Sequence, residues 1–397
     1  MSFEMKRKVL FVHHVSVVGG ASYCLLNIIK NLNGSNIYPI VLLKNDGPLV
    51  NELNKLNVEV HFFSALATVP YNRTMFHYRV LLQFYNVYKA QKQFEHILYE
   101  IKPDIVYLNN VMLHPYLKTA KSLGFKTAIH IREHWPLDEH KQQLRILQNN
   151  VRLYADSVIA INKYSASMVP SIGHKTTIIY DWIDFSDRYR PFNLEKIFGD
   201  EVNSLKIILY TGGMQDIKGV VEVFRGFREN IRGEEYRLLA LGVDVNKMIS
   251  SRTIKNLISS LLGRKNIFSE VRKETLLDSR IKCIPSTYYI KDLIEKSFCT
   301  ISYFNIPHAN LAMAESILLG TVPIAAETNE SMEYSNNGEY ALLFKMKDYE
   351  EFSKILKNLE VRRNEIISKM GKGSQYINSK FSKTTNGQKL LNVLKTI

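Results

Sequence analysis

One pattern governs most of this sequence: a short run rich in valine and isoleucine is followed by a longer polar or amphipathic segment, and the pair recurs along the chain. Parallel strands that are covered by helices on both faces show nearly continuous apolar runs. The alternation therefore predicts a doubly wound α/β domain. The runs of the first half of the chain lie at residues 8–15, 38–45, 58–63, 104–110, 126–133, 157–162 and 176–182.

The alternation stops after Trp182 and restarts near residue 206. The stretch between, DFSDRYRPFNLEKIFGDEVNS, is polar and contains proline, which is typical of a linker. The second series of apolar runs lies at residues 206–213, 236–242, 280–286, 298–304 and 321–327. The restart predicts a second doubly wound domain.

The length of the chain agrees with two domains, because 397 residues with 46% hydrophobic side chains suffice for two cores. We predict two Rossmann-like domains that face a central cleft, where ligands bind outside the carboxyl ends of the strands. The expected extents are 1–185 for the first domain, 186–203 for the linker, 204–375 for the second domain and 376–397 for a C-terminal helix that packs back on the first domain.

A net charge of +14 predicts an anionic partner. Nucleotide phosphates and an acidic membrane surface both fit, and a soluble basic surface without such a partner is the alternative. We predict no nucleic-acid partner, because Lys and Arg are scattered and the sequence has no zinc-finger spacing, no RNP-like aromatic strand and no basic tail.

The cysteines and the apolar segments indicate the compartment. Cys24, Cys283 and Cys299 have no metal-type spacing and each lies in an apolar segment, so we expect buried free thiols. The N-terminus has no signal-peptide pattern, and no stretch approaches roughly 20 uncharged residues. We expect a cytoplasmic protein without a membrane span.

The segment 74–100 carries apolar and aromatic residues at helical intervals, with Arg79, Lys89 and Lys92 between them. This pattern favours a helix that packs on the core of the first domain. A basic helix rich in aromatic residues also fits the surface of an anionic membrane, and peripheral contact at the inner face of the plasma membrane remains the alternative.

Two glycine-rich segments follow strands. Gly19 and Gly20 come after the first predicted strand, and Gly212 and Gly213 come after the first strand of the second domain, with Lys218 close behind. Paired glycines let a ligand approach the backbone, and the start of the next helix presents free N–H groups to an anion. Neither segment has the spacing of the dinucleotide fingerprint or of a Walker A loop, and a plain strand-to-helix turn is the alternative.

Charged residues also end the fifth predicted strand, in the sequence His130-Ile131-Arg132-Glu133-His134. Such side chains are costly at the end of a buried strand unless a cleft uses them. Zinc is the competing interpretation, but no third ligand is patterned near His130 and His134. We therefore predict a binding role for His130, Arg132 and Glu133, and no metal.

A single carboxylate, Glu315, lies among small and apolar residues in the stretch PHANLAMAESILLGTVPIAA, residues 307–326. A carboxylate on a packed helix is costly to desolvate, so it needs a hydrogen-bond donor or a polar ligand. The alternative is a solvated glutamate at the edge of a surface helix.

Five segments in this order resemble a known family. The chain is similar to retaining GT-B glycosyltransferases of glycosyltransferase family 4 over nearly its whole length. The similarity rests on residues 8–29, 155–169, 178–189, 210–219 and 310–326. The resemblance implies a GT-B fold and transfer of a sugar from a nucleotide diphosphate donor, held mainly by the second domain. The acceptor, a glycan or a lipid-linked sugar in cell-surface polysaccharide synthesis, is held mainly by the first domain, and no metal or other cofactor is expected.

The resemblance also assigns residues. Glu315 matches the second glutamate of the family's E-x7-E motif, whose carboxylate accepts hydrogen bonds from the ribose. The N–H groups from Asn310 through Leu311 to Ala312 face the diphosphate, Lys218 stabilises the leaving phosphate, and Gly320 ends the helix in a left-handed cap. His130 or Arg132 lines the sugar pocket, and Glu133, Gly19 and Gly20 lie on the acceptor side.

Two positions depart from the family pattern. The first glutamate of E-x7-E falls at Pro307, so the contact to the donor sugar is missing or comes from His308 or Asn310. The family's phosphate-binding arginine falls at Gly213, which leaves Lys218. These losses favour one alternative, a non-catalytic GT-B relative that binds a glycan or a partner enzyme. An inverting GT-B enzyme with different catalytic residues is a further alternative.

Overall fold

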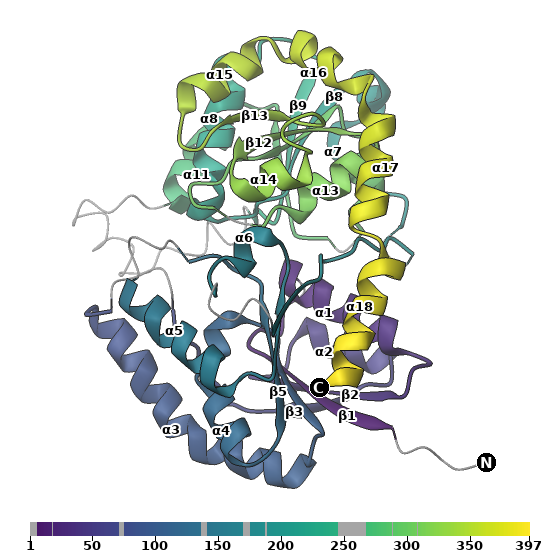
Figure 1. Ribbon diagram of the computed structural model, residues 1–397. Coiled ribbons are helices and arrows are strands. Elements are labelled where there is room, and N and C mark those ends of the chain that lie inside the picture. Colours follow the sequence, from purple (N-terminus) through teal and green to yellow (C-terminus); the bar gives the residue numbers. More distant parts are fainter. Residues whose placement is uncertain are drawn as a thin grey trace. The chain divides into compact units, whose positions relative to one another are not determined.

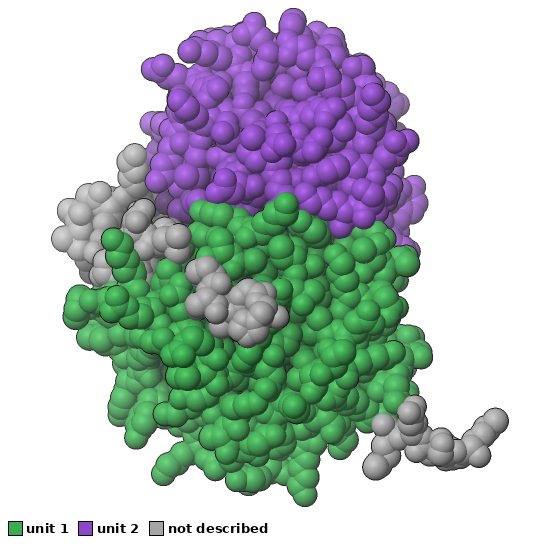
Figure 2. Space-filling view, viewed as in Figure 1, with its two compact units in different colours: residues 1–183, 381–397 green, residues 184–380 purple. Residues whose placement is uncertain are grey.

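The computed structural model describes residues 6–17, 19–70, 75–135, 141–169, 175–186, 189–244, 267–287, 289–307 and 309–397. The chain forms two compact units. Unit 1 comprises Met1–Ile183 together with Phe381–Ile397, and unit 2 comprises Asp184–Lys380 (Figure 2). The segment predicted as a linker belongs to unit 2, where it forms α7 (Glu195–Phe198) and the 3-10 helix η3 (Asp200–Ser204).

Unit 1 contains a parallel sheet of seven strands in the order β3-β2-β1-β4-β5-β6-β7 (Figure 1). The strands are β1 (Arg7–His13), β2 (Ile37–Leu43), β3 (Glu59–Phe62), β4 (Ile105–Leu108), β5 (Lys126–Ile131), β6 (Ser157–Ala160) and β7 (Thr176–Ile178). The helices are α1 (Gly20–Leu32), α2 (Pro48–Lys55), α3 (Tyr78–Ile101), η1 (Val111–Leu113), α4 (Tyr116–Ser122), α5 (Lys141–Tyr154), α6 (Lys163–Ala166) and α18 (Lys383–Thr396). All seven apolar runs of the first series therefore form strands.

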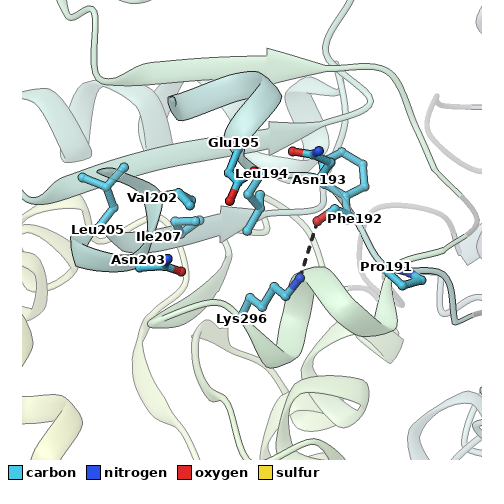
Figure 3. A pocket seen from close by; sticks show the side chains of 10 residues that line it. All are labelled: Pro191, Phe192, Asn193, Leu194, Glu195, Val202, Asn203, Leu205, Ile207 and Lys296. Carbon is cyan, nitrogen blue, oxygen red and sulfur yellow. Dashed lines mark hydrogen bonds between the residues drawn. The ribbon is translucent and has the colours of Figure 1, made fainter. Parts of the chain in front are cut away.

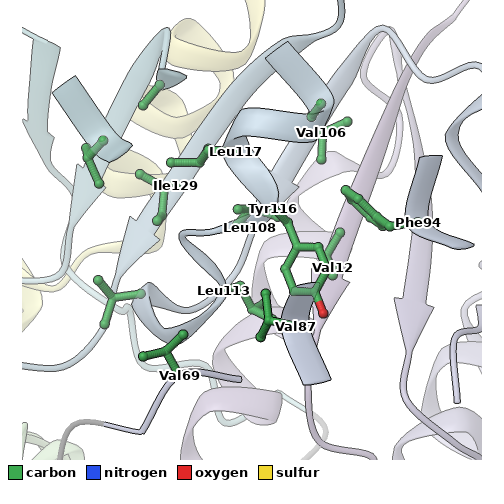
Figure 4. Close-up of a cluster of buried hydrophobic side chains, with 14 of the residues drawn as sticks. Val12, Val69, Val87, Phe94, Val106, Leu108, Leu113, Tyr116, Leu117 and Ile129 are labelled. Carbon is green, nitrogen blue, oxygen red and sulfur yellow. The ribbon is translucent and has the colours of Figure 1, made fainter. Parts of the chain in front are cut away.

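Each face of this sheet has its own core. On one face, α3, α4 and α5 pack on side chains such as Val12, Leu108 and Ile129, and the ring of Phe94 lies 4.9 Å from that of Tyr116 (Figure 4). On the other face, α1, α2 and α18 cover a second cluster of buried side chains. Nearly continuous apolar strands are what a sheet covered on both faces requires.

The end of the chain completes unit 1. Leu390 and Leu394 of α18 are fully buried in the core that contains β1. The Nη1 atom of Arg7 donates to the carbonyl of Leu394 at 2.7 Å, and the backbone N–H of Tyr180 donates to Asn386 Oδ1 at 3.1 Å. The chain enters unit 1 again after Lys380, which ends α17 (Met370–Lys380).

Unit 2 contains a parallel sheet of six strands in the order β10-β9-β8-β11-β12-β13. The strands are β8 (Lys206–Tyr210), β9 (Tyr236–Leu241), β10 (Ile281–Ile284), β11 (Cys299–Ser302), β12 (Val322–Glu327) and β13 (Leu342–Lys345). The other helices of the unit are η4 (Asp216–Lys218), α8 (Val220–Asn230), α11 (Ile267–Leu277), α12 (Lys291–Glu295), α13 (Leu311–Leu318), α14 (Asn329–Tyr334), α15 (Tyr349–Lys357) and α16 (Leu359–Ile367). The sequence pattern predicted five of these strands and missed β13.

Both sheets reverse their strand order at one point. In unit 1 the first strand, β1, lies between β2 and β4, and in unit 2 the first strand, β8, lies between β9 and β11. Open α/β sheets bind ligands outside the carboxyl ends of the strands at such switch points. The β1/β4 and β8/β11 junctions are therefore the expected positions of a ligand site.

Two further predictions concern the burial of the three cysteines and the absence of a membrane-spanning helix. Cys24 and Cys299 are buried free thiols as predicted, whereas Cys283 is partly exposed. Burial raises the pKa of the Cys299 thiol to about 12. Within the described ranges, no helix combines the length and the apolar character that crossing a bilayer requires.

Candidate functional site

The loop after β8 is held in shape by a tyrosine. The hydroxyl of Tyr210 lies 3.1 Å from the carbonyl oxygens of both Gly213 and Lys218, so it links the two ends of the turn. A Cβ atom at Gly212 would lie 2.2 Å from this hydroxyl, and Gly213 has a φ of +67°. The contact with Tyr210 therefore requires glycine at 212, and the backbone conformation favours glycine at 213.

Lys218 ends the short helix η4 in this loop, at the β8/β11 switch point. Its side chain is half-buried, and burial lowers the pKa of its ammonium group. Among the described residues, no carboxylate pairs with this ammonium group. A desolvated cation without a counter-ion is suited to an anionic ligand.

Gly219 joins this loop to the segment that follows β11. It has a φ of +62° at the N-cap of α8, and a Cβ atom there would lie 2.6 Å from the carbonyl oxygen of Tyr303. Two residues further on, the backbone N–H of Asn305 donates to Ile217 O at 2.9 Å, and Asn305 Nδ2 donates to Asp216 O at 2.8 Å. These contacts bring the β8 loop against the segment that leads to α13.

The N-terminus of α13 has an amide as its cap. Asn310 Oδ1 accepts from the backbone N–H of Met313 at 3.2 Å and from Ser302 Oγ at 3.2 Å. Its Nδ2 atom is buried and has no hydrogen-bond partner among the described residues. A buried amide donor without an acceptor is costly, so an acceptor supplied by a ligand would satisfy it. Leu311 and Ala312, which begin the helix, are half-buried.

Glu315 lies in α13 with only 3% of its surface exposed. The interpretation of this glutamate as a solvated surface residue is therefore wrong. The helix ends as predicted: Gly320 has a φ of +79°, and the backbone N–H of Thr321 donates to the carbonyl of Ser316 at 2.9 Å. Such a left-handed glycine is a common helix cap.

In unit 1, a chain of hydrogen bonds crosses the β1/β4 switch point. Arg132 Nη1 donates to both carboxylate oxygens of Asp181, at 2.7 and 2.6 Å, and its Nε donates to Asn109 Oδ1 at 3.1 Å. Asn109 Nδ2 lies 3.1 Å from His13 Nδ1, and His13 Nε2 lies 3.1 Å from Ser22 Oγ. The Ser22 hydroxyl donates to the carbonyl of Val17 at 2.7 Å.

This order of partners fixes the proton of His13. The amide of Asn109 donates to Nδ1, so the proton of the neutral ring is on Nε2, which donates to Ser22. Burial lowers the pKa of His13 well below its usual value, and the nearby His14 and Arg132 act in the same direction. His13 therefore stays neutral, and its two hydrogen bonds connect Asn109 to Ser22 in α1.

His130 and Arg132 are both buried, with 1% and 6% of their surfaces exposed. His130 Nδ1 lies 2.7 Å from the Tyr107 hydroxyl and 3.2 Å from Arg132 Nη2, both of which donate to it. Burial lowers the pKa of Arg132, but the adjacent Asp181 raises it, and the net change is upward. These hydrogen bonds of the two side chains are all made to other groups of the protein.

Glu133 follows Arg132 at the carboxyl end of β5. Asn110 Nδ2 donates to its Oε1, and its Oε2 is buried with no hydrogen-bond partner of good geometry in the described ranges. Burial raises the pKa of this carboxyl group to about 7, although Arg132 opposes the shift. Glu133 therefore changes its charge near neutral pH.

Comparison with known proteins supports the fold. No protein-family model matches the chain, and no curated protein matches it. Among solved structures, HepE of Anabaena in complex with UDP-glucose matches with a TM-score of 0.75 at 16% identity, over 98% of this chain and 100% of that one. A glycosyltransferase of Rickettsia africae matches with a TM-score of 0.69 at 16% identity, over 98% of both chains. Sucrose-phosphate synthase of Thermosynechococcus elongatus matches with a TM-score of 0.72 at 12% identity, over 98% of both chains.

The fold is GT-B. Within this GT-B chain, the structure brings Gly212, Gly213 and Lys218 together with the segment before α13 at one edge of unit 2. It brings Arg132, His130 and Glu133 together at the carboxyl end of β5 in unit 1. Gly19 and Gly20 lie at the start of α1, where an added Cβ atom would meet nothing within 4 Å. His308, the remaining predicted site residue, lies outside the described residues.

The structure adds residues that the sequence did not single out. Asp181 and Asn109 hold Arg132, and His13 extends the network to α1. Their position at the ends of strands could have marked them as candidates. Their pairing could not be read from the sequence, because the partners lie far apart in the chain. The zinc interpretation gains no support, because His134 stacks on Tyr164 at 3.5 Å and the described residues contain no group of three or more possible ligands.

A pocket of about 450 Å³ lies in unit 2 (Figure 3). Ile207, at the start of β8, is among its lining residues, together with the segment from Pro191 to Glu195 and with Lys296. The ammonium group of Lys296 lies 3.5 Å from the carbonyl of Phe192 and 2.8 Å from Asp292. None of the predicted site residues lines this pocket, which is at the amino end of the strand.

Proposed function

We propose that this protein is a retaining glycosyltransferase that moves a sugar from a nucleoside diphosphate donor to a glycan or a lipid-linked acceptor. The observations that carry the proposal concern two side chains at the switch point of unit 2. Within the described part of the chain, Lys218 has no carboxylate partner there, and the buried donor Asn310 Nδ2 has no acceptor. The match of the whole chain to a HepE structure that contains UDP-glucose supports the same class of donor.

In this proposal, the diphosphate lies against the N-terminus of α13 and the β8 loop. The backbone N–H groups of Leu311 and Ala312 and the ammonium group of Lys218 stabilise the negative charge that develops on the β-phosphate oxygen as it leaves. Glycine at 212 and 213 lets the ligand approach the backbone. The buried carboxylate of Glu315, in the same helix, accepts hydrogen bonds from the ribose hydroxyls.

The transfer itself requires no covalent bond to the protein. The bond between the anomeric carbon and the β-phosphate oxygen breaks, and the acceptor oxygen attacks the same face of the sugar. The departing phosphate oxygen takes the acceptor proton, so the anomeric configuration is retained. The contribution of the protein is the placement of positive charge and N–H groups around the leaving group.

In unit 1, we assign Arg132 and His130 as positioning residues and not as groups that touch the sugar. Arg132 holds Asn109 and, through it, His13 and Ser22, so it fixes the carboxyl ends of β1 and β4 against α1. Glu133 is the group at this edge that changes charge near neutral pH. We place it, with Gly19 and Gly20, on the side that holds the acceptor.

A panel of nucleoside diphosphate sugars tests the proposal. The purified protein is incubated with each donor and with oligosaccharide or lipid-linked acceptors, and the product and its anomeric configuration are followed by NMR. We expect transfer with retention from one donor class, and about 100- to 1000-fold slower transfer by Lys218→Ala. Lys354→Ala, which removes an exposed lysine of α15, is the matched control and should transfer at the wild-type rate.

A non-catalytic GT-B relative is the second candidate function, and one observation favours it. Gly213 occupies the position of the family's arginine, and its φ of +67° disfavours any side chain there. The loop therefore lacks a cation at position 213. A protein that binds a nucleoside diphosphate but neither transfers nor hydrolyses any sugar of the panel would belong to this class. Inversion at the anomeric carbon would indicate the inverting alternative.

A further inference from the structure

The outer face of α3 exposes an unusual set of large apolar side chains. Among the described residues, sixteen large hydrophobic side chains are exposed, and seven of them lie between residues 76 and 99. Those seven are Phe76, Tyr78, Leu81, Leu82, Tyr85, Tyr88 and Tyr99. Scattered exposed apolar residues need no explanation, but a concentration on one helix marks an interaction surface.

The helical spacing places most of these side chains on one face. Tyr78, Leu81, Leu82 and Tyr85 follow the i, i+3, i+4, i+7 pattern, with exposed fractions of 65%, 50%, 51% and 51%. The opposite face of the same helix carries Val80, Val87 and Phe94, which are buried in the core. The helix thus has two apolar faces, and the core of unit 1 uses only one of them.

The exposed face is also basic. Arg79, Lys89 and Lys92 are exposed on α3, and the sequence contains no Asp or Glu between Glu59 and Glu95. The Lys89 ammonium group lies 4.6 Å from the centre of the Tyr85 ring, and Arg79 Nε donates to the Tyr78 hydroxyl at 2.9 Å. Tyrosine and basic side chains with long aliphatic stems are the residues that occupy the boundary between acyl chains and head groups.

The neighbouring helices extend the positive charge. α4 packs against both α3 and α5, and the three helices cover the same face of the sheet (Figure 1). Together they contain eight Lys and Arg residues and two acidic residues, Glu95 and Glu100. The basic residues are Arg79, Lys89, Lys92, Lys118, Lys121, Lys141, Arg145 and Arg152. This excess disfavours contact with a second copy of the same positively charged face.

We propose that the outer face of α3 binds the surface of an anionic lipid bilayer, with Leu81, Leu82 and the flanking tyrosines in the interface and with Lys89 and Lys92 at the lipid phosphates. The aliphatic pair Leu81 and Leu82 argues for lipid, because nucleic-acid surfaces use aromatic and basic side chains but gain little from exposed leucines. The surface supplies both of the signals that stable peripheral binding needs, apolar area and positive charge. This inference goes beyond the proposed sugar transfer, and it is tested without any donor or acceptor.

Vesicle co-sedimentation tests it. The wild-type protein is mixed with vesicles of zwitterionic phosphatidylcholine alone, or with 30 mol% phosphatidylserine added, a composition that we choose as the probe. We expect binding to the anionic vesicles only, and weaker binding as the salt concentration rises. Leu81→Gln/Leu82→Gln and Lys89→Gln/Lys92→Gln should each weaken the partition coefficient by about fivefold for every residue replaced.

Matched controls separate this surface from general stickiness. Leu276→Gln/Leu277→Gln replaces an adjacent exposed leucine pair on α11 of unit 2, where the exposed fractions are 75% and 57%. Lys354→Gln/Lys357→Gln removes two exposed lysines of α15. Both controls should bind anionic vesicles like the wild type. Because all four pairs are exposed, circular dichroism should show the same fold for every variant.

Four results would overturn the proposal. Wild-type protein that stays in the supernatant with anionic vesicles has no lipid-binding surface. Equal losses in the two lysine variants would show that net charge alone drives binding, and equal losses in the two leucine variants would show that any exposed leucine pair suffices. A concentration-dependent dimer in light scattering that the Leu81→Gln/Leu82→Gln variant disperses would show that a second copy of the chain covers this face instead.

Discussion

One nitrogen of Arg132, Nη1, donates to both carboxylate oxygens of Asp181, at 2.7 and 2.6 Å, in the interior of unit 1. The Arg132 side chain is 4% exposed and that of Asp181 is 17% exposed. Removing one partner of such a pair leaves a buried charge without compensation. The pair therefore holds the end of β5 against the segment that follows β7. Its loss should disturb the hydrogen bonds that lead from Arg132 through Asn109 and His13 to Ser22.

The first prediction concerns this pair. Asp181→Ala should lower the free energy of unfolding of unit 1 by about 3 to 5 kcal/mol, because Arg132 remains buried and charged. Tryptophan fluorescence in urea measures it, since both tryptophans of the chain, Trp135 and Trp182, are buried in unit 1. Glu52→Ala, which breaks the exposed 2.7 Å pair with Lys55, is the control and should change stability by less than about 1 kcal/mol. Equal effects of the two variants would show that the Arg132 pair does not stabilise the fold.

The second prediction concerns pH and Glu133. Burial raises the pKa of this carboxyl group from 4.5 to about 7 in the folded state, so the folded protein holds the proton more tightly than the unfolded chain. The stabilisation from that proton is complete below about pH 4.5 and is lost as pH rises to about 7. Glu133→Gln cannot lose a proton, so its stability relative to wild type should increase between pH 5 and pH 8, by up to about 3 kcal/mol. A difference that stays constant with pH would contradict the raised pKa.

The third prediction concerns the turn before α8. Gly219→Ala places a methyl group in a left-handed conformation and against the carbonyl oxygen of Tyr303, so it should cost about 1 to 3 kcal/mol. Gly371→Ala in α17 is the matched control, because an added Cβ atom there meets nothing within 4 Å, and it should be neutral or stabilising by up to about 1 kcal/mol. Thermal unfolding followed by circular dichroism compares them. A Gly219→Ala variant as stable as Gly371→Ala would show that the turn tolerates a side chain.

The fourth prediction concerns Glu315 and the ribose. If its carboxylate accepts hydrogen bonds from the ribose hydroxyls, the wild type should bind a nucleoside diphosphate about 10- to 100-fold more tightly than its 2′,3′-dideoxy analogue. Glu315→Gln should lose most of this discrimination while it binds the dideoxy analogue like the wild type. Equal discrimination by both proteins, measured by calorimetry, would place the ribose elsewhere.

Much of the fold follows from the apolar runs. Twelve of them form strands, because a continuous run of buried residues has few alternatives in a sheet covered on both faces. The sequence pattern missed β13, Leu342–Lys345, which is as short as strands that the pattern found and which comes shortly after a turn in which Asn337 and Gly338 have positive φ. The resemblance to GT-B enzymes gave the fold name, which the solved structures support.

The candidate site was only partly predictable. Glycines and a lysine after β8 are local signals, so Gly212, Gly213 and Lys218 could be named from the sequence. The partners of Arg132 could not be named, because Asp181 and Asn109 lie 49 and 23 residues away in the chain. Burial was the missing quantity, because the sequence alone does not tell how deeply an arginine is buried or which protein groups it contacts.

The central claim is that the β8 loop and the start of α13 bind a nucleoside diphosphate through Lys218. Calorimetric titration with UDP, GDP and ADP tests it most directly, with wild type, Lys218→Ala and the control Lys354→Ala. We predict that one of these nucleotides binds the wild type and the control equally, and that Lys218→Ala binds it about 10- to 100-fold more weakly. Binding of none of the three by the wild type, or equal affinity of Lys218→Ala, would contradict the account.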